Sequence, residues 1–269
     1  MSLDAVKTRG LVLLGCGKMG SALLQGWLEA GVPASSISII DPNPSDWVRQ
    51  TGAVVNGDLP DAPAVCLIAV KPQMMGEALD QISAFGGGET VFLSIAAGTS
   101  IAAFESAFGA NTPIIRTMPN TPAAVGRGIT AIIGNARVDE PALQLAESLL
   151  QAVGQTVRLT DEDQMDAVTA VSGSGPAYVF HMIETLAAAG EAEGLPADMA
   201  MALAKATVAG SGALAEAADE TPEQLRINVS SPGGTTLAGL SVLMAKDGLP
   251  DLMRRTVAAA AQRSRELKG

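Results

Sequence analysis

The residues best suited to chemistry lie in two glycine-rich segments, of which the first is GCGKMG at residues 15–20. Gly15 permits a tight turn, Gly17 lets a pyrophosphate approach the backbone, and Gly20 lets a helix pack closely on the preceding strand. The helix N-terminus would then point its free N–H groups at the phosphates. A plain glycine turn is the alternative, but Asp41 at the end of the next apolar run adds the acidic group of a dinucleotide site.

The second segment is SSPGGTT at residues 230–236, which interrupts two alanine-rich helical stretches. Pro232 and the glycines end one helix, and Thr235 or Thr236 can begin the next. Backbone N–H groups and hydroxyls at a helix N-terminus predict an anion site, although a simple helix-turn-helix connection is the alternative. A third segment, SGSGPAY at residues 172–178, is explained by a kink or a close helix crossing at least as well as by ligand contact.

The elements that must position these segments change in character near Thr160. Before it, short β-rich runs alternate with helical patterns, which predicts a mostly parallel sheet covered by helices. The expected strands are residues 11–14, 37–40, 65–70, 91–95, 114–116, 129–133 and 156–159. After Thr160 we find no strand candidate. We therefore expect an α/β protein with a Rossmann-type dinucleotide-binding domain at residues 1–160 and an all-helical domain at residues 161–269.

Small and polar residues follow five of the expected strands, in the segments GCGKMG, DPN, VKPQ, SIAAG and TMPNTP. The carboxyl ends of parallel strands meet at one edge of a sheet, where ligands of open α/β sheets bind. Each segment alone could be an ordinary loop. Together they predict a cofactor groove.

Composition excludes several classes of protein. A net charge of −11 without a basic cluster argues against nucleic-acid binding, and no apolar run reaches the ~18 residues of a membrane span. Cys16 and Cys66 fall in expected buried positions, so we expect no disulfide and no membrane, and a cytoplasmic location. A single histidine beside two cysteines argues against a His/Cys metal site. A small-molecule substrate is the expected partner.

Six segments in this order and spacing resemble the pyrroline-5-carboxylate reductase family: GCGKMG, AVKPQ, SIAAG, RTMPNTP, DAVTAVSGSGPAYVF and NVSSPGGTT. The resemblance covers essentially the whole chain. It implies an NAD(P)H-dependent enzyme that reduces the cyclic C=N bond of 1-pyrroline-5-carboxylate to give L-proline, the last step of proline biosynthesis. It also implies a helical domain that interlocks with a second subunit, giving a homodimer and in many members a decamer.

The resemblance assigns roles to particular residues. Cofactor contacts fall on Gly15, Cys16, Gly17, Lys18, Met19, Gly20, Asp41, Asn56, Ala69, Val70, Lys71, Pro72 and Ala97. The loop for the substrate carboxylate falls on Ser231, Pro232, Gly233, Gly234, Thr235 and Thr236. Within that loop, the catalytic residue is Thr236, which would hydrogen-bond the imine nitrogen.

Asp41 is a departure, because relatives often carry a small polar residue there or a basic neighbour suited to a 2′-phosphate. An acidic side chain suits a ribose 2′-hydroxyl, so we expect either NADPH or NADH to be used, with a preference for NADH. The alternative is that Asp41 only opens the following turn.

Two other functions remain open from the sequence. A β-hydroxyacid dehydrogenase would need a lysine in its cleft, but Lys205 and Lys246 lie outside the glycine-rich loops. A non-catalytic dinucleotide sensor would not need SSPGGTT. We expect His181, in the middle of a helix, to be structural.

Overall fold

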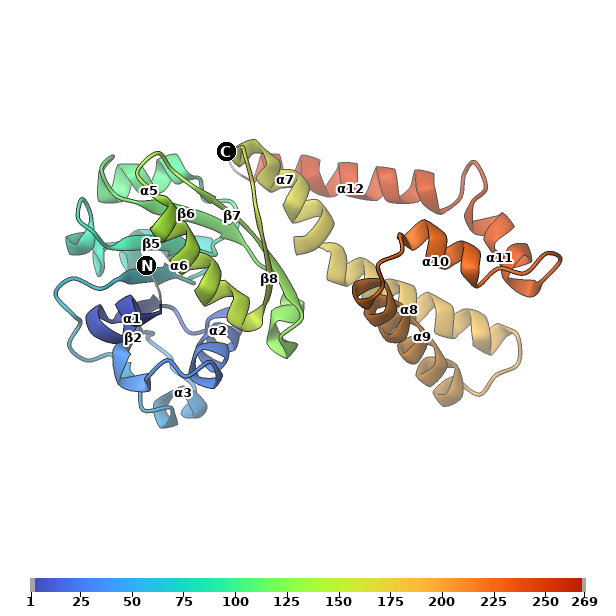
Figure 1. Cartoon of the computed structure of the whole chain (residues 1–269), viewed down its shortest axis with the longest axis horizontal. Helices are drawn as coiled ribbons and strands as arrows, with labels where there is room; N and C mark the ends of the chain where they lie inside the picture. The colour runs from blue at the N-terminus through green and yellow to red at the C-terminus, as the bar shows by residue number, and fades with distance from the viewer. Residues whose placement is uncertain (1–2, 268–269) are drawn as a thin grey trace. The chain divides into compact units, whose positions relative to one another are not determined.

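The computed structural model describes residues 3–267, which divide into two compact units (Figure 1). Unit 1 comprises residues up to 173 and returns at residue 261, whereas unit 2 comprises residues 174–260. The strands end at Arg158, close to the predicted boundary at residue 160, but compact packing continues to residue 173. Residues 261–267 pack with unit 1, in which Ser264 Oγ donates a hydrogen bond of 2.8 Å to Asp166.

Unit 1 is built on one eight-stranded sheet in the order β3-β2-β1-β4-β5-β6-β7-β8. Every pairing is parallel except that of β6 with β7. The strands are β1 Leu11–Leu14, β2 Ile37–Ile40, β3 Val54–Val55, β4 Val65–Ile68, β5 Val91–Ser94, β6 Ile114–Met118, β7 Gly128–Gly134 and β8 Gly154–Arg158. The predicted Rossmann-type fold is confirmed. Only β3 was missed, because two residues are too short for a strand pattern.

Helices cover both faces of the sheet in unit 1 and form all of the regular structure described in unit 2. Their bounds are α1 Asp4–Arg9, α2 Lys18–Glu29, α3 Asp46–Gln50, α4 Met75–Asp80, α5 Ile101–Phe108, α6 Glu140–Leu150, α7 Met165–Val168, α8 Gly175–Ala192, α9 Ala197–Ala217, α10 Pro222–Asn228, α11 Thr235–Leu243 and α12 Leu249–Glu266. Among residues 3–267, no helix combines the length and apolar character that a membrane span requires.

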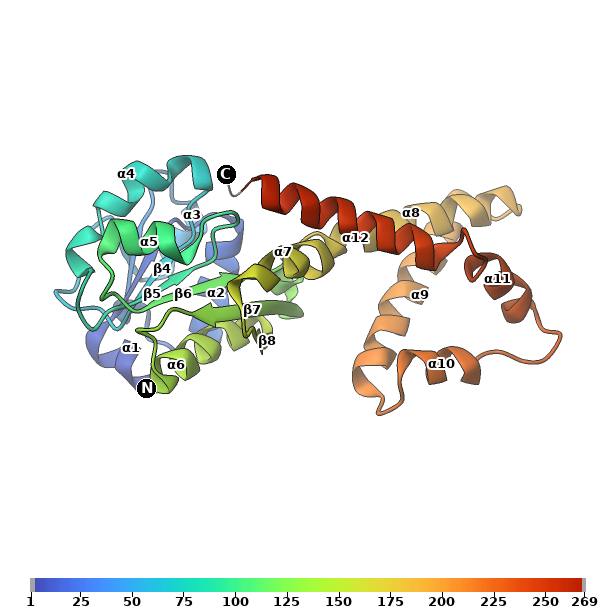
Figure 2. The same ribbon diagram turned by 90° about the horizontal axis from the view of Figure 1, so that it is seen from above.

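Successive residues of the central strands point alternately into two apolar cores, one on each face of the sheet. Leu11 and Leu13 face the core that includes α2 and α6, whereas Val12 and Leu14 face the core that includes α4 and α5. Figure 2 shows α4 and α5 on the opposite side of the sheet from α1 and α6. Because both faces are buried, the central strands read as continuous apolar runs, as parallel strands do.

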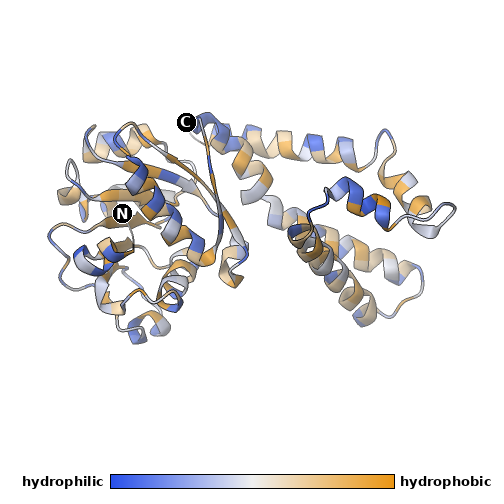
Figure 3. Ribbon diagram, in the orientation of Figure 1, coloured by the Kyte–Doolittle hydropathy of each residue, from blue (hydrophilic) through white to orange (hydrophobic). Residues whose placement is uncertain are grey.

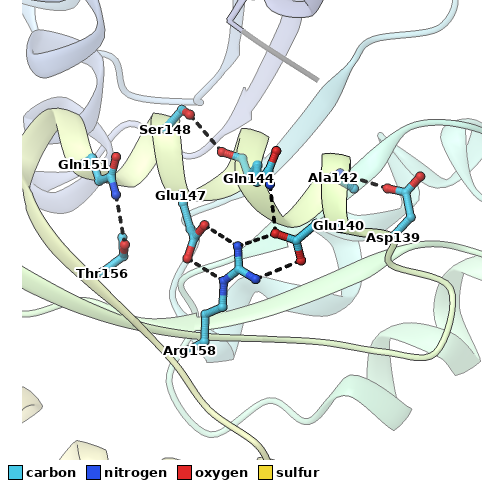
Figure 4. A network of polar contacts seen from close by, with 9 residues as sticks. All are labelled: Asp139, Glu140, Ala142, Gln144, Glu147, Ser148, Gln151, Thr156 and Arg158. Atoms are coloured by element: carbon cyan, nitrogen blue, oxygen red, sulfur yellow. Dashed lines mark hydrogen bonds and ion pairs between the residues drawn. The ribbon is translucent and has the colours of Figure 1, made fainter.

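Ion pairs connect the last strand, β8, to helix α6. Arg158 donates hydrogen bonds of 2.7 to 2.8 Å to the carboxylates of Glu140 and Glu147 (Figure 4). Its planar guanidinium serves two carboxylates at once, which a lysine could not do in this geometry. This pairing fixes the outer strand of the sheet against its covering helix.

Unit 2 has a small core of its own between α8 and α9. Ala187, Ala200 and Ala204 are its buried members, and Ile183 and Met201 pack against them. Larger apolar side chains remain exposed on the same helices, where apolar residues recur along α8 and α9 (Figure 3). Three small side chains bury little apolar surface, so unit 2 has too small a core to account for its stability as an isolated body.

Candidate active site

The predicted cofactor residues follow five neighbouring parallel strands of unit 1 and lie along one edge of the sheet. Across the sheet they run from Asn56 after β3, through Asp41 after β2 and residues 15–20 after β1, to residues 69–72 after β4 and Ala97 after β5. Backbone hydrogen bonds continue the strand pairing into these loops, from Gly15 N to Ile40 O and from Ala69 N to Leu14 O, each 2.8 Å. The sheet therefore brings all of these predicted residues to its carboxyl edge.

The three glycines of the first turn differ in what surrounds them. Gly15 has a φ of 87°, and a Cβ atom there would lie 2.9 Å from Val70 Cγ1. A Cβ atom at Gly20 would lie 2.6 Å from the Gly15 carbonyl oxygen. A Cβ atom at Gly17 would meet no protein atom within 4 Å. Packing inside the protein thus explains Gly15 and Gly20, whereas Gly17 borders open space that a ligand can enter.

That open space adjoins the N-terminus of α2. Gly17 is the N-cap residue and supplies no side chain to the first-turn N–H groups, and Lys18 is exposed beside it. Helix N–H groups and the helix dipole favour a phosphate at such a position. The residues present therefore fit a dinucleotide pyrophosphate.

Neither cysteine suits nucleophilic chemistry. Burial raises the pKa of the Cys16 thiol, with a further increase from the charge of Asp41 and an opposing effect of the hydrogen bond with Ser21. Burial alone raises the pKa of Cys66 far above its usual range. Both thiols stay protonated at neutral pH, so unlike a thiolate they are poor nucleophiles.

Next to the glycine turn, Asp41 and Asn56 join the ends of β2 and β3. Asp41 N donates to Asn56 Oδ1 at 2.9 Å, and Asn56 Nδ2 donates back to the Asp41 carbonyl at 2.7 Å. Asn56 has a φ of 52°, which makes it the only residue other than glycine with a positive φ within residues 3–267. Asparagine tolerates this left-handed conformation better than most residues do.

A cavity of about 890 Å³ opens beside these residues. Its walls include Ile40, Pro42, Asn56, Val70 and Met74. This size lies within the usual range for small-molecule sites, and apolar walls suit a flat aromatic ring. Sequence reasoning found Asn56 and Val70 but missed the wall formed by α4 and the residues next to it, which contains Gln73, Glu77 and Gln81. The helical pattern after Lys71 carried no sign that one face of this helix borders a cavity.

The predicted substrate loop lies in unit 2 and folds as a tight turn followed by a helix. Gly234 N donates to Ser231 O at 3.0 Å, and Gly233, two residues after Ser231, has a φ of 71°. Proline in the second position and glycine with positive φ in the third are typical of a type II turn. Thr235 then begins α11, and both Thr235 and Thr236 are exposed. The loop therefore presents backbone donors and hydroxyls together at a helix N-terminus.

The SGSGPAY segment is explained at least in part by packing. A Cβ atom at Gly173 would lie 2.7 Å from Met118 Cε, so this glycine lets the helix approach the end of β6. Residues Thr169–Gly173 form a π-helix, and Pro176 occupies the first turn of α8. A proline in a first turn replaces an N–H group that would have no helical partner. Gly173 therefore packs against a side chain of β6, which is a packing role but not a crossing of two helices.

Other candidate catalytic side chains of unit 2 are solvent-exposed. The side chain of His181 is 74% exposed and lies 3.2 Å from Glu184. Lys205 and Lys246 are exposed as well, one within α9 and the other after α11. None of the three lies in the substrate loop.

Two family models match the sequence of this chain, one in each of its two parts. Residues 10–98 match the family model "NADP oxidoreductase coenzyme F420-dependent", and residues 162–267 match "Pyrroline-5-carboxylate reductase dimerisation". A pyrroline-5-carboxylate reductase of Synechocystis sp. is 40% identical over 264 residues, which cover 96% of this chain and 97% of the relative. The chain belongs to the pyrroline-5-carboxylate reductase family.

Two solved structures of the family agree with this assignment. The pyrroline-5-carboxylate reductase of Coxiella burnetii superposes with a TM-score of 0.92 at 31% identity, covering 97% of this chain and 99% of that one. A Plasmodium falciparum pyrroline carboxylate reductase with NADP bound gives a TM-score of 0.83 at 29% identity, covering 98% and 99%. The chain is therefore an oxidoreductase with an NAD(P)-binding domain of the Rossmann type.

Proposed function

We propose that this chain reduces 1-pyrroline-5-carboxylate to L-proline with NADH or NADPH, as the last step of proline biosynthesis. The observation that carries the proposal is the SSPGGTT loop, folded as a type II turn at the start of α11, in a chain with a Rossmann-type sheet. A dinucleotide-binding protein without a small anionic substrate has no need of such a loop.

The residues of unit 1 bind and orient the cofactor. We assign the pyrophosphate to residues 15–20 and the N-terminus of α2, the ribose to Asp41, and the flanking positions to Asn56, residues 69–72 and Ala97. The bound cofactor supplies the hydride that adds to the carbon of the substrate C=N bond.

The loop of unit 2 binds the substrate carboxylate, which is the strongest handle on a small cyclic imine. The exposed N-terminus of α11 favours a negative charge, and Ser231 and Thr235 add hydroxyl donors. Pro232 restricts the turn, and Gly233 holds the positive φ that this turn requires immediately before the N-terminus of α11.

Thr236 is the proposed catalytic residue. As hydride adds to the carbon, the ring nitrogen becomes more basic and takes up one proton from water, and the Thr236 hydroxyl, which can both donate and accept, hydrogen-bonds this nitrogen. Catalysis then depends mainly on positioning the ring carbon against the hydride donor, without a strongly acidic side chain. The second residue of α11 places this hydroxyl next to the carboxylate site.

We also propose the division of labour within the chain. Residues 1–160 form the dinucleotide-binding domain, and residues 161–269 form the domain for dimerisation and substrate binding, which supports a homodimer and possible assembly into a decamer. An apolar groove of about 770 Å³ on unit 2, lined by Met182, Leu186 and Leu252, is the surface that a second subunit would cover.

The free thiols of Cys16 and Cys66 suit a reducing compartment, so we place the enzyme in the cytoplasm. The reaction is tested by following NADH and NADPH oxidation with 1-pyrroline-5-carboxylate and, separately, with a panel of 3-oxoacids. We expect turnover with the imine and none with the 3-oxoacids. Turnover of a 3-oxoacid alone would replace this proposal with a β-hydroxyacid dehydrogenase.

A further inference from the structure

The carboxylate of Asp41 is held at both of its oxygens by backbone amides. Cys16 N donates to Oδ2 at 2.6 Å, and Asn43 N donates to Oδ1 at 2.7 Å. One of these donors belongs to the glycine turn and the other to the loop after β2. Rotation of the side chain would break both hydrogen bonds, so Asp41 has one strongly favoured rotamer.

The backbone of Asp41 is held as firmly as its side chain. Asn56 uses both atoms of its amide group on the N–H and the carbonyl of Asp41, at 2.9 and 2.7 Å. Asn56 N in turn donates to Ile39 O at 2.8 Å, which continues the pairing of β3 with β2. Asn56 therefore acts on Asp41 from the neighbouring strand, fifteen residues further along the chain.

Nearby cations do not neutralise this carboxylate. Lys18 and Arg49 are the nearest basic residues in the sequence, both are exposed, and within residues 3–267 neither forms an ion pair with Asp41. Each Asp41 oxygen keeps a lone pair beyond the one used by the backbone amide. The half-buried carboxylate can thus accept hydrogen bonds from ribose hydroxyls, but it would repel a 2′-phosphate.

We propose that Asn56 is a positioning residue which, together with the amides of Cys16 and Asn43, fixes Asp41 so that the site binds NADH more tightly than NADPH. A mobile aspartate could turn away from a 2′-phosphate, whereas this one cannot without losing two charge-assisted hydrogen bonds. The inference rests on the proposed function only in assigning the ribose to Asp41. It concerns the selection of the cofactor and holds whatever the reduced substrate is.

The test is binding to the full-length chain in the absence of any imine, measured by isothermal titration calorimetry. The probes are NADH and NADPH, with ADP-ribose and its 2′-phosphorylated form as fragments that undergo no reaction. We expect wild type to bind NADH and ADP-ribose at least tenfold more tightly than their 2′-phosphorylated counterparts. Equal or tighter binding of the phosphorylated probes would overturn the proposal.

Two variants separate the roles of Asp41 and Asn56. Asp41→Ser should lower the ratio of the NADH affinity to the NADPH affinity at least tenfold. Asn56→Gly keeps the positive φ but removes the amide, so it should reduce the preference by a smaller factor, about threefold, while Asp41 is still present. Asp46→Ser removes an equal charge in α3 and should leave the ratio at its wild-type value.

The ratio of the NADH affinity to the NADPH affinity distinguishes positioning from a general loss of structure. Unfolding would lower the apparent affinity for both probes by the same factor and leave this ratio unchanged. An Asn56→Gly protein with an unchanged ratio would show that Asn56 does not position Asp41. Should that variant fail to fold, Asn56→Ser, which is uncharged and has a side chain too short to bond both the N–H and the carbonyl of Asp41, provides the same comparison. Selective NADH binding without turnover of 1-pyrroline-5-carboxylate would leave this inference standing and reject the proposed function.

Discussion

The position of a Cβ atom at Gly20 lies 2.6 Å from the carbonyl oxygen of Gly15, whereas the same position at Gly17 faces open space. The lack of a side chain therefore has a different physical reason at each of these two glycines. Gly20 is required by contact between α2 and the turn that precedes it, and Gly17 is required only if something else must come close.

This difference predicts opposite outcomes for two alanine substitutions. Gly20→Ala should lower the thermal midpoint, because the added methyl group must displace backbone atoms, at a cost of about 1–3 kcal/mol. Gly17→Ala should leave the midpoint within about 1 °C, because the added methyl group meets no protein atom within 4 Å. A shift of 1 °C corresponds to well under 1 kcal/mol in the free energy of unfolding. Gly17→Ala should instead weaken NADH binding about tenfold or more. Scanning calorimetry and titration of NADH check the pair, and unchanged NADH affinity in Gly17→Ala would place the pyrophosphate elsewhere.

Thr236 should matter for rate and not for cofactor affinity. Thr236→Val removes the hydroxyl at nearly constant volume, and loss of a hydrogen bond to a charged partner costs about 1.5–3 kcal/mol. If that bond forms only in the transition state, kcat falls roughly tenfold to a hundredfold with NADH affinity unchanged. Thr8→Val, an equivalent change in α1 of unit 1, is the control. A Thr236→Val enzyme with wild-type kcat would remove Thr236 from the mechanism.

The exposed apolar surface of unit 2 predicts an obligate homodimer. Phe180 is 58% exposed, and Leu186 in the apolar groove is 45% exposed, which is unfavourable for a free surface. Leu186→Asp should shift sedimentation toward the monomer and reduce turnover. Val125→Asp, at an exposed apolar position of unit 1, should leave the dimer intact. A stable and active wild-type monomer at nanomolar concentration would contradict the prediction.

The pairing of Arg158 with Glu140 and Glu147 predicts a pH-dependent contribution to stability. Hydrogen bonds from Arg158 lower the pKa of Glu140. A carboxylate with a lowered pKa stabilises the fold above its unfolded-state pKa, near 4.3, and this stabilisation is lost as pH falls through the lower folded-state pKa. Arg158→Gln should therefore lower the thermal midpoint slightly at pH 7 and by less near pH 3. Arg49→Gln, at an exposed position, serves as the control, and an equal difference at both pH values would argue against the pairing.

Much of unit 1 could be predicted from short segments of sequence. The apolar runs at residues 11–14 and 37–40 match β1 and β2 to the residue, and the GCGKMG segment leads into the predicted helix, although α2 begins at Lys18 and not after Gly20. The turn at Pro232 and Gly233 could be predicted equally well, because proline fixes its own φ and glycine allows the positive φ that the turn needs. These signals lie within a few residues of the structure that they specify.

The tertiary structure alone decided the features that depend on which strands become neighbours. Asn56 reaches Asp41 only because β3 pairs with β2, and β3 itself is two residues long and has no pattern of its own. The cavity wall formed by α4 likewise depends on how that helix packs over the sheet. The glycine turn and the identity of Asp41 were determined by the sequence. The immobility of Asp41 was not, because its hydrogen bonds join groups up to 25 residues apart that only the folded sheet brings together.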